Sequence, residues 1–136
     1  MISIGRKLFE EVDTPLESKI VSEDPINKLT ERESSWTAEI YGIDPFPSGK
    51  ASGSGSSLIH SNGISISSWQ GKFTTYSREV IIFKGRDINK NGGFTVLRTY
   101  FTDSLELSWI NGLVCLLNGE FDSQDKVFRC EGYELM

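Results

Sequence analysis

Arg98 is the residue of this sequence that most directly suggests chemistry. It lies in a segment of alternating apolar residues, where it shares one side of an expected strand with Val96 and Tyr100. A guanidinium among apolar side chains needs a carboxylate, because a buried unpaired charge is costly. That carboxylate could come from Glu120 or Glu131 on neighbouring strands, or from the acidic group of a bound molecule. The alternative is that Arg98 simply points to solvent.

A bound apolar acid would use a small set of side chains. Arg98 and Tyr100 would hold its acidic group, while Trp69 and Phe83 would contact its tail. Glu120 is a further polar candidate. The candidate ligand-binding residues are therefore Trp69, Phe83, Arg98, Tyr100 and Glu120, and no residue is assigned a catalytic role.

The sequence lacks the residue patterns typical of nucleophilic catalysis and of metal binding. His60 is the single histidine, no Gly-x-Ser-x-Gly motif surrounds a serine, and the two cysteines are not paired at zinc-ligand spacing. The segment that starts at Asp87 begins like a calcium loop, but its twelfth residue is Arg98 and not glutamate, so a hairpin turn is expected. The sequence therefore predicts no metal and no cofactor.

Composition bounds the class of protein. The chain has 136 residues, 38% of them hydrophobic and 24% charged, which is typical of one globular domain spanning residues 1–136. A net charge of -5 leaves no basic excess for nucleic acid. The longest uncharged apolar run, Leu113–Leu117, is too short to cross a bilayer, and the N-terminus has no signal-peptide core. No nucleic-acid or membrane partner is expected, and the default location is cytoplasmic.

The elements that would position these side chains are mostly strands. Period-two alternation with β-branched and aromatic residues recurs from Ser18 onward, separated by turn signals such as Ser61-Asn62-Gly63 and Asn91-Gly92-Gly93. About eight short antiparallel strands predict a sandwich or a closed barrel. In the Gly/Ser-rich segment after Pro45, Gly53 and Gly55 indicate a strand that bends or is closely approached.

One or two short helices are also expected. Asp103–Glu106 has the form of a helix N-terminus, and Gly112 could end that helix. Trp109, with Leu105 beside it, should then close one end of the barrel, and Asn111 should bond to backbone groups at the helix end. Near the N-terminus, helical spacing of apolar residues predicts a second helix, with a strand as the alternative; these residues are Ile4, Leu8, Phe9 and Val12.

The last two strands should form a hairpin that carries both cysteines. A turn centred on Ser123 and Gln124 would place Cys115 opposite Gly132 and Cys130 opposite Leu117. The thiols would then be diagonal neighbours about 7 Å apart, too far for an ordinary disulfide, so both cysteines should be reduced.

Two strands are apolar on both faces and therefore need cover outside as well as inside. One is Leu113–Leu117, and the other is Val80–Phe83. A helix, a loop or a second copy of the chain could supply the outer cover, so a homodimer is expected.

Several short motifs follow in a recognisable order: Gly53-x-Gly55, Trp69-Gln70-Gly71, Gly85, Leu97-Arg98, Trp109–Gly112, Gly119–Asp122 and Tyr133–Leu135. Over residues 50–136 this pattern resembles the calycin-like, or lipocalin-like, small β-barrel families of uncharacterised bacterial and archaeal proteins. The resemblance implies an all-β, up-and-down antiparallel barrel of about eight strands that is often dimeric. The Gly-x-Trp motif of secreted lipocalins is absent, since Ser34 and Ser35 precede Trp36.

Three functions remain open at this point. The first is an uncharacterised barrel that binds an apolar or amphipathic small molecule in its lumen. The second is a cyclase or isomerase of a hydrophobic acid, in which Arg98, Tyr100 or Glu120 steers charge. The third is a packed barrel that acts only through dimerisation. Pocket volume is the observation that separates them.

Overall fold

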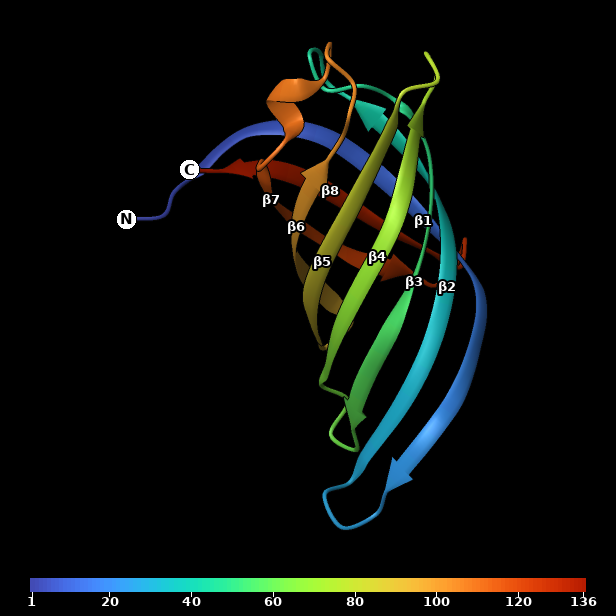
Figure 1. Cartoon of the computed structure of the whole chain (residues 1–136). Coiled ribbons are helices and arrows are strands. Elements are labelled where there is room, and N and C mark those ends of the chain that lie inside the picture. The colour runs from blue at the N-terminus through green and yellow to red at the C-terminus, as the bar shows by residue number, and fades with distance from the viewer.

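Eight antiparallel strands close into a ring in the computed structural model, which describes residues 1–136 (Figure 1). The strands are β1 (Ile4–Asp24), β2 (Leu29–Gly42), β3 (Gly49–His60), β4 (Ser65–Thr75), β5 (Val80–Lys90), β6 (Gly93–Phe101), β7 (Val114–Asp122) and β8 (Val127–Leu135). Each strand pairs with its sequence neighbour, and β8 pairs back with β1. Closure leaves no open sheet edge. The predicted all-β, up-and-down barrel is confirmed.

The two ends of the barrel carry different parts of the chain. The helix end carries the chain termini and a short 3₁₀ helix, η1 (Ser108–Ile110). The hairpin end carries the β1–β2 turn, which extends past the other strands (Figure 1). Ser3 and Met136 exchange backbone hydrogen bonds of 2.8 and 2.9 Å, which ties the two termini together.

The prediction of an N-terminal helix is wrong, and the alternative prediction, a strand, is observed. β1 pairs with β2 along most of its length and with β8 over its first half. Its pairing with β8 is irregular on both sides of Lys7, and this bulge lets the consecutive residues Leu8 and Phe9 both be buried. The bulge interrupts the period of two, so the apolar spacing in the sequence resembled that of a helix.

The second expected helix is reduced to η1. Asp103 and Ser104 have no regular structure, a bend and turn follow at Leu105–Leu107, and the exposed Leu105 does not close the barrel. Ile110 is the buried residue at this end instead, and Trp109 lies edge-on to Phe46. Asn111 bonds to backbone groups as expected, but they belong to Thr102 directly after β6 and not to the helix end: its side chain accepts from Thr102 N–H at 2.7 Å and donates to Thr102 C=O at 3.0 Å.

Aromatic side chains fill the helix end of the lumen. Phe9, Phe73, Phe83 and Tyr100 are fully buried on four different strands. Phe46, from the β2–β3 loop, lies among them with ring centroids 4.8 Å from Phe9 and 6.2 Å from Phe73. Because these rings occupy the interior, this half of the barrel has a packed core.

The C-terminal hairpin forms with a register two residues away from the expected one. Cys115 faces Glu134, and Cys130 faces Gly119. Asp122 sets this turn, since its Oδ1 accepts the N–H groups of Gln124 and Asp125 at 3.0 and 3.1 Å. The two cysteines are buried and unpaired, as expected, but they lie further apart than predicted.

The outer face of β5–β7 stays partly apolar. Ile82, Leu97 and Phe101 are 45%, 49% and 57% exposed. No helix or loop of this chain takes the covering role that the sequence suggested, and the homodimer stays a prediction. None of the helices has the length and apolarity needed to traverse a bilayer.

Candidate functional site

The hairpin end of the barrel contains a cavity of about 410 Å³. All eight strands contribute to its lining, and the partly exposed Leu16 and Phe121 lie among the lining residues. The lumen is therefore packed at one end and hollow at the other. A volume of this size falls in the usual range for small-molecule sites.

The cavity has two walls of opposite character. Its polar wall lies on β3–β5 and consists of Ser57, Ser65, Ser67, Asp87 and Asn89. Its apolar wall lies on β6–β8 and consists of Phe94, Val96, Leu117, Phe121 and Phe128. The Phe128 ring centroid is 5.7 Å from that of Phe94 and 4.9 Å from that of Phe121, so the three phenylalanines form a continuous aromatic surface within the apolar wall. The cavity as a whole is amphipathic.

Two indole rings, those of Trp36 and Trp69, also line the cavity. Each lies against a glycine of β3: a Cβ added at Gly53 would be 2.5 Å from the Trp36 ring, and one at Gly55 would be 2.5 Å from the Trp69 ring. Any side chain at either position would displace the indole. The close approach predicted at these glycines is confirmed, and its consequence is to seat the two rings.

A buried ion pair separates the packed half from the cavity. Arg98 lines the cavity, and its two terminal nitrogens donate to the two carboxylate oxygens of Glu11 at 2.7 and 3.1 Å. Its guanidinium also lies 4.5 Å from the centre of the Phe83 ring. This bidentate geometry neutralises both charges within the protein.

The ion pair fixes the charge state of Glu11. Burial alone would raise the pKa of the Glu11 carboxyl, but the charge and hydrogen bonds of Arg98 lower the pKa below its ordinary value. Burial likewise opposes the charged form of Arg98, and Glu11 raises the pKa of Arg98 well above its ordinary value. Glu11 is therefore ionised, with both of its oxygens engaged by the guanidinium.

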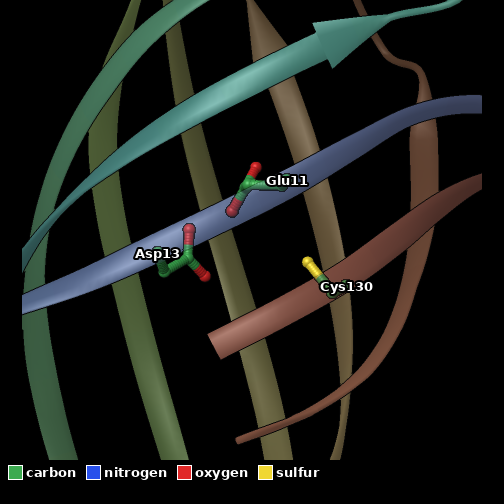
Figure 2. A group of neighbouring side chains, drawn as sticks. All are labelled: Glu11, Asp13 and Cys130. Carbon is green, nitrogen blue, oxygen red and sulfur yellow. The ribbon is translucent and has the colours of Figure 1, made fainter. Parts of the chain in front are cut away.

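Asp13 lies beside this pair on the same face of β1. Figure 2 shows the Glu11 and Asp13 carboxyl groups next to each other on β1, with Cys130 extending from the adjacent β8. Burial and then the Glu11 charge raise the pKa of Asp13 well above its ordinary value, against the opposing charge of Arg98. Protonation of Asp13 relieves the repulsion between the two carboxyl groups.

These three residues could in principle hold a metal ion, because their ligand atoms lie within 4.8 Å of one another. The surrounding chemistry does not favour one. Both Glu11 oxygens already bind Arg98, and burial raises the pKa of the Cys130 thiol well above its ordinary value. A cation would have to displace the guanidinium and two protons, so the cluster is better described as a protonated carboxyl group and a thiol beside an ion pair.

A second carboxyl group lies on the polar wall. Asp87 of β5 accepts a hydrogen bond of 3.1 Å from the Trp69 indole through Oδ2. Its strand partner on β4 is Ser67, whose hydroxyl is 2.6 Å from that of Ser57. Burial raises the pKa of Asp87, and the Trp69 hydrogen bond partly opposes this effect.

The five candidate residues occupy different environments. Trp69 and Arg98 line the cavity. Phe83 and Tyr100 are buried in the packed half, and neither lines the cavity. Glu120 is exposed on β7, because inward positions on this strand are odd-numbered, and it contributes nothing to the lumen. The partner of Arg98 is Glu11, and neither Glu120 nor Glu131 takes that role.

Sequence reasoning missed Glu11, Asp13 and Asp87. The alternation Phe9-Glu11-Asp13 was the available signal, since all three residues share a face in a strand. In the helix that was expected at the N-terminus, Phe9, Glu11 and Asp13 would lie on different faces, so their common face was missed. Asp87 was assigned to a turn, although β5 continues to Lys90.

The class that this geometry defines is a closed eight-stranded β-barrel with a half-filled lumen. The sequence matches no protein-family model, and no curated protein shows significant similarity to it. Solved structures with the same fold do exist, at low sequence identity. They are β-barrel-like proteins, mostly of unknown function, so membership of the calycin or lipocalin families is not established.

Three of these structures align over nearly the full lengths of both chains. A β-barrel-like protein from Acinetobacter baumannii has a TM-score of 0.81 at 14% identity and covers 100% of this chain and 97% of its own. A protein of unknown function from Rhodopseudomonas palustris has a TM-score of 0.81 at 11% identity, with coverages of 100% and 99%. An enzyme from Penicillium herquei has a TM-score of 0.72 at 14% identity, with coverages of 100% and 94%. At these identities the likeness shows the fold alone.

Proposed function

We propose that this barrel binds an amphipathic small molecule in the cavity at its hairpin end. The single observation that carries the proposal is the pairing of an aromatic wall with a hydroxyl- and carboxyl-bearing wall around about 410 Å³. A molecule with one apolar and one polar face would bury its rings against Phe94 and Phe128. Its polar edge would face the serines of β3 and β4.

The structure alters the expected chemistry of that molecule. One of the alternatives from the sequence was an apolar acid held by Arg98 and Tyr100. Arg98 is already neutralised by Glu11, and the Tyr100 hydroxyl is buried outside the cavity. An anionic group would have to break the ion pair, so the favoured ligand is no longer an acid.

Adjacent residues of β4 provide a matched pair of variants to test the proposal. Ser67 points into the cavity and Ser68 points to solvent. Ser67→Phe should fill part of the cavity, whereas Ser68→Phe adds the same ring to the outer surface. Both variants should keep the wild-type far-ultraviolet circular dichroism spectrum.

The readout is fluorescence of N-phenyl-1-naphthylamine, an uncharged apolar probe that brightens on leaving water. We expect wild-type protein and Ser68→Phe to enhance its emission, and Ser67→Phe to lose at least about tenfold in affinity, the equivalent of about 1.4 kcal/mol. Equal binding by both variants would place the probe outside the cavity and overturn the proposal.

A second candidate function is catalysis of a cyclisation or isomerisation. The Glu11–Asp13 pair favours it, because a protonated carboxyl group beside an ionised one can supply an acid and a base. The fold relative from Penicillium herquei is an enzyme, although fold alone does not transfer activity. With a converted substrate in hand, Asp13→Asn should abolish turnover without lowering the melting temperature. Unchanged turnover in Asp13→Asn would remove this candidate.

A further inference from the structure

Three buried side-chain polar atoms in the barrel have no hydrogen-bond partner: Asp13 Oδ1, Asp87 Oδ1 and Tyr100 OH. Two of the three belong to carboxyl groups that line the same cavity. Buried polar atoms almost always have partners, so each orphan requires an explanation. For the two aspartates the shared explanation is that their partner is a bound molecule.

We infer that Asp13 and Asp87 are protonated hydrogen-bond donors that select an uncharged ligand with accepting oxygens, such as an aromatic ketone. This inference rests on the proposed function and specifies the ligand class of the same cavity. A carboxylic acid donates through its O–H, whereas a carboxylate only accepts. The protonation state therefore decides which ligands fit.

Most of the surroundings of Asp13 favour the protonated form. On its own strand it lies next to Glu11, which Arg98 of β6 holds as an anion. From β8 the neighbour is the Cys130 thiol, and the β2 strand partner is the apolar Ala38. The positive charge of Arg98 acts in the opposite direction on Asp13, but Glu11 accepts both of its strong hydrogen bonds.

Asp87 has no charged partner. Trp69 donates to its Oδ2 at 3.1 Å, and Ser67 and Val96 are its cross-strand partners on β4 and β6. No cation forms a salt bridge with either Asp87 or Asp13. Burial without a counter-ion favours the neutral acid, in agreement with the raised pKa of Asp87.

The walls complete the description of the ligand. Its rings would lie between the apolar wall and the indoles of Trp36 and Trp69, where aromatic stacking favours a flat molecule. Its accepting oxygens would face Asp13 and Asp87. An anion is rejected, because it would meet the Glu11 charge while Arg98 is already paired.

The protonation state can be tested without any ligand. Infrared spectra recorded at a pH above the ordinary pKa values of both aspartate and glutamate, where exposed carboxyl groups are ionised, should still contain the carbonyl stretch of protonated carboxylic acids. Asp13→Asn and Asp87→Asn should each remove part of this band. Asp24→Asn is the control: hydrogen bonds from Asn27 lower the pKa of the half-buried Asp24, so the control should leave the band unchanged. Absence of the band in wild-type protein would overturn the inference.

The ligand class can be tested with a matched pair of probes measured by calorimetry. The uncharged 2-acetylnaphthalene and the anionic 2-naphthoate share one ring system. We expect the ketone to bind at least about tenfold more tightly, and we expect Asp13→Leu and Asp87→Leu to weaken its binding by about the same factor. Asp13→Asn, which keeps a donor, should retain binding. Equal or tighter binding of 2-naphthoate, or no binding of either probe, would contradict the assigned ligand class.

The two proposals fail in different ways. If probe binding ignores Ser67→Phe, the cavity is not the binding site and the proposed function fails. If binding is lost in Ser67→Phe but is indifferent to Asp13→Leu and Asp87→Leu, the cavity binds ligands and only the role of the two aspartates is overturned.

Discussion

Arg98 and Glu11, 87 residues apart in sequence, meet inside the barrel through two hydrogen bonds of 2.7 and 3.1 Å. Their side chains are 6% and 0% exposed. The pair lies where the packed half of the lumen ends and the cavity begins, with the Phe83 ring against the guanidinium. It closes one end of the binding site and removes the one positive charge that could hold an anion.

Breaking this pair should destabilise the barrel strongly. Glu11→Met and Arg98→Met should each lower the free energy of unfolding by about 3–5 kcal/mol, because each leaves one buried charge unpaired. The double variant should recover most of the loss, since it removes both charges. Urea denaturation of the four proteins measures this coupling.

The exposed pair Arg6–Glu134, with side chains 54% and 28% exposed, is the control for that cycle. Arg6→Met should cost less than about 1 kcal/mol. Additive losses in Glu11→Met and Arg98→Met would show that the two side chains do not interact. By the same reasoning Arg98→Ala would lower the melting temperature, so a loss of activity in that variant could not report on function alone.

The pH dependence of stability should carry the signature of Asp13. Its pKa is raised in the folded state, so the folded protein holds this proton more tightly than the unfolded chain. The stabilising contribution is complete below the ordinary pKa near 3.8 and is lost as pH rises through the raised value. Asp13→Asn should therefore gain stability relative to wild type as pH rises through this window.

Asp24 should behave in the opposite sense. Its pKa is lowered by Asn27, so its contribution is present above the ordinary value and is lost as pH falls. Thermal unfolding of wild type, Asp13→Asn and Asp24→Asn across this pH range compares the two. A constant difference between Asp13→Asn and wild type at all pH values would contradict the assigned protonation of Asp13.

Gly132 should tolerate no side chain. A Cβ at this position would lie 2.3 Å from the Phe9 ring, which is fully buried. Gly132→Ala should cost about 1–3 kcal/mol of unfolding free energy through overpacking. Gly93→Ala is the matched control, because the nearest atom to its added Cβ would be 3.7 Å away. Phe9→Leu combined with Gly132→Ala should recover part of the loss, and equal costs for the two glycines would refute the packing argument.

The cysteines should be unreactive in the folded protein. Burial raises the pKa of the Cys115 thiol to about 12 and that of Cys130 well above its ordinary value. Neither thiol is ionised near neutral pH, so a thiol-specific reagent such as dithionitrobenzoate should label both cysteines only after unfolding. Rapid labelling of native protein would show that the C-terminal hairpin is open.

The fold was readable from the sequence because its signals are local. Period-two alternation in strands such as Phe94–Phe101 and turn residues such as Asn91-Gly92 define the meander without long-range information. The β1 bulge at Lys7–Phe9 was not readable, since a bulge depends on pairing with β8, more than 100 residues away. The register of β7 and β8 was predicted wrongly for a local reason, because hydrogen bonds of Asp122 to Gln124 and Asp125 fix a turn whose centre differs from the expected one.

The site was readable only in part. Arg98 stood out because a charge between Val96 and Tyr100 on one strand face is unusual. The positions of its partner Glu11 and the neighbouring Asp13 depend on closure of the barrel, which places inward side chains of β1 opposite those of β6. The sequence also could not show which half of the lumen is filled, because Phe46, a central ring of the packed half, comes from a loop.

Nuclear Overhauser contacts between 2-acetylnaphthalene and the protein test the central claim most directly, since they locate a bound molecule within the barrel. Ligand protons should show contacts to Trp36, Trp69 and Phe128, which line the cavity. They should show none to Phe73, which lies in the packed half. Contacts confined to Ile82, Leu97 and Phe101 on the outer face would contradict a site inside the lumen.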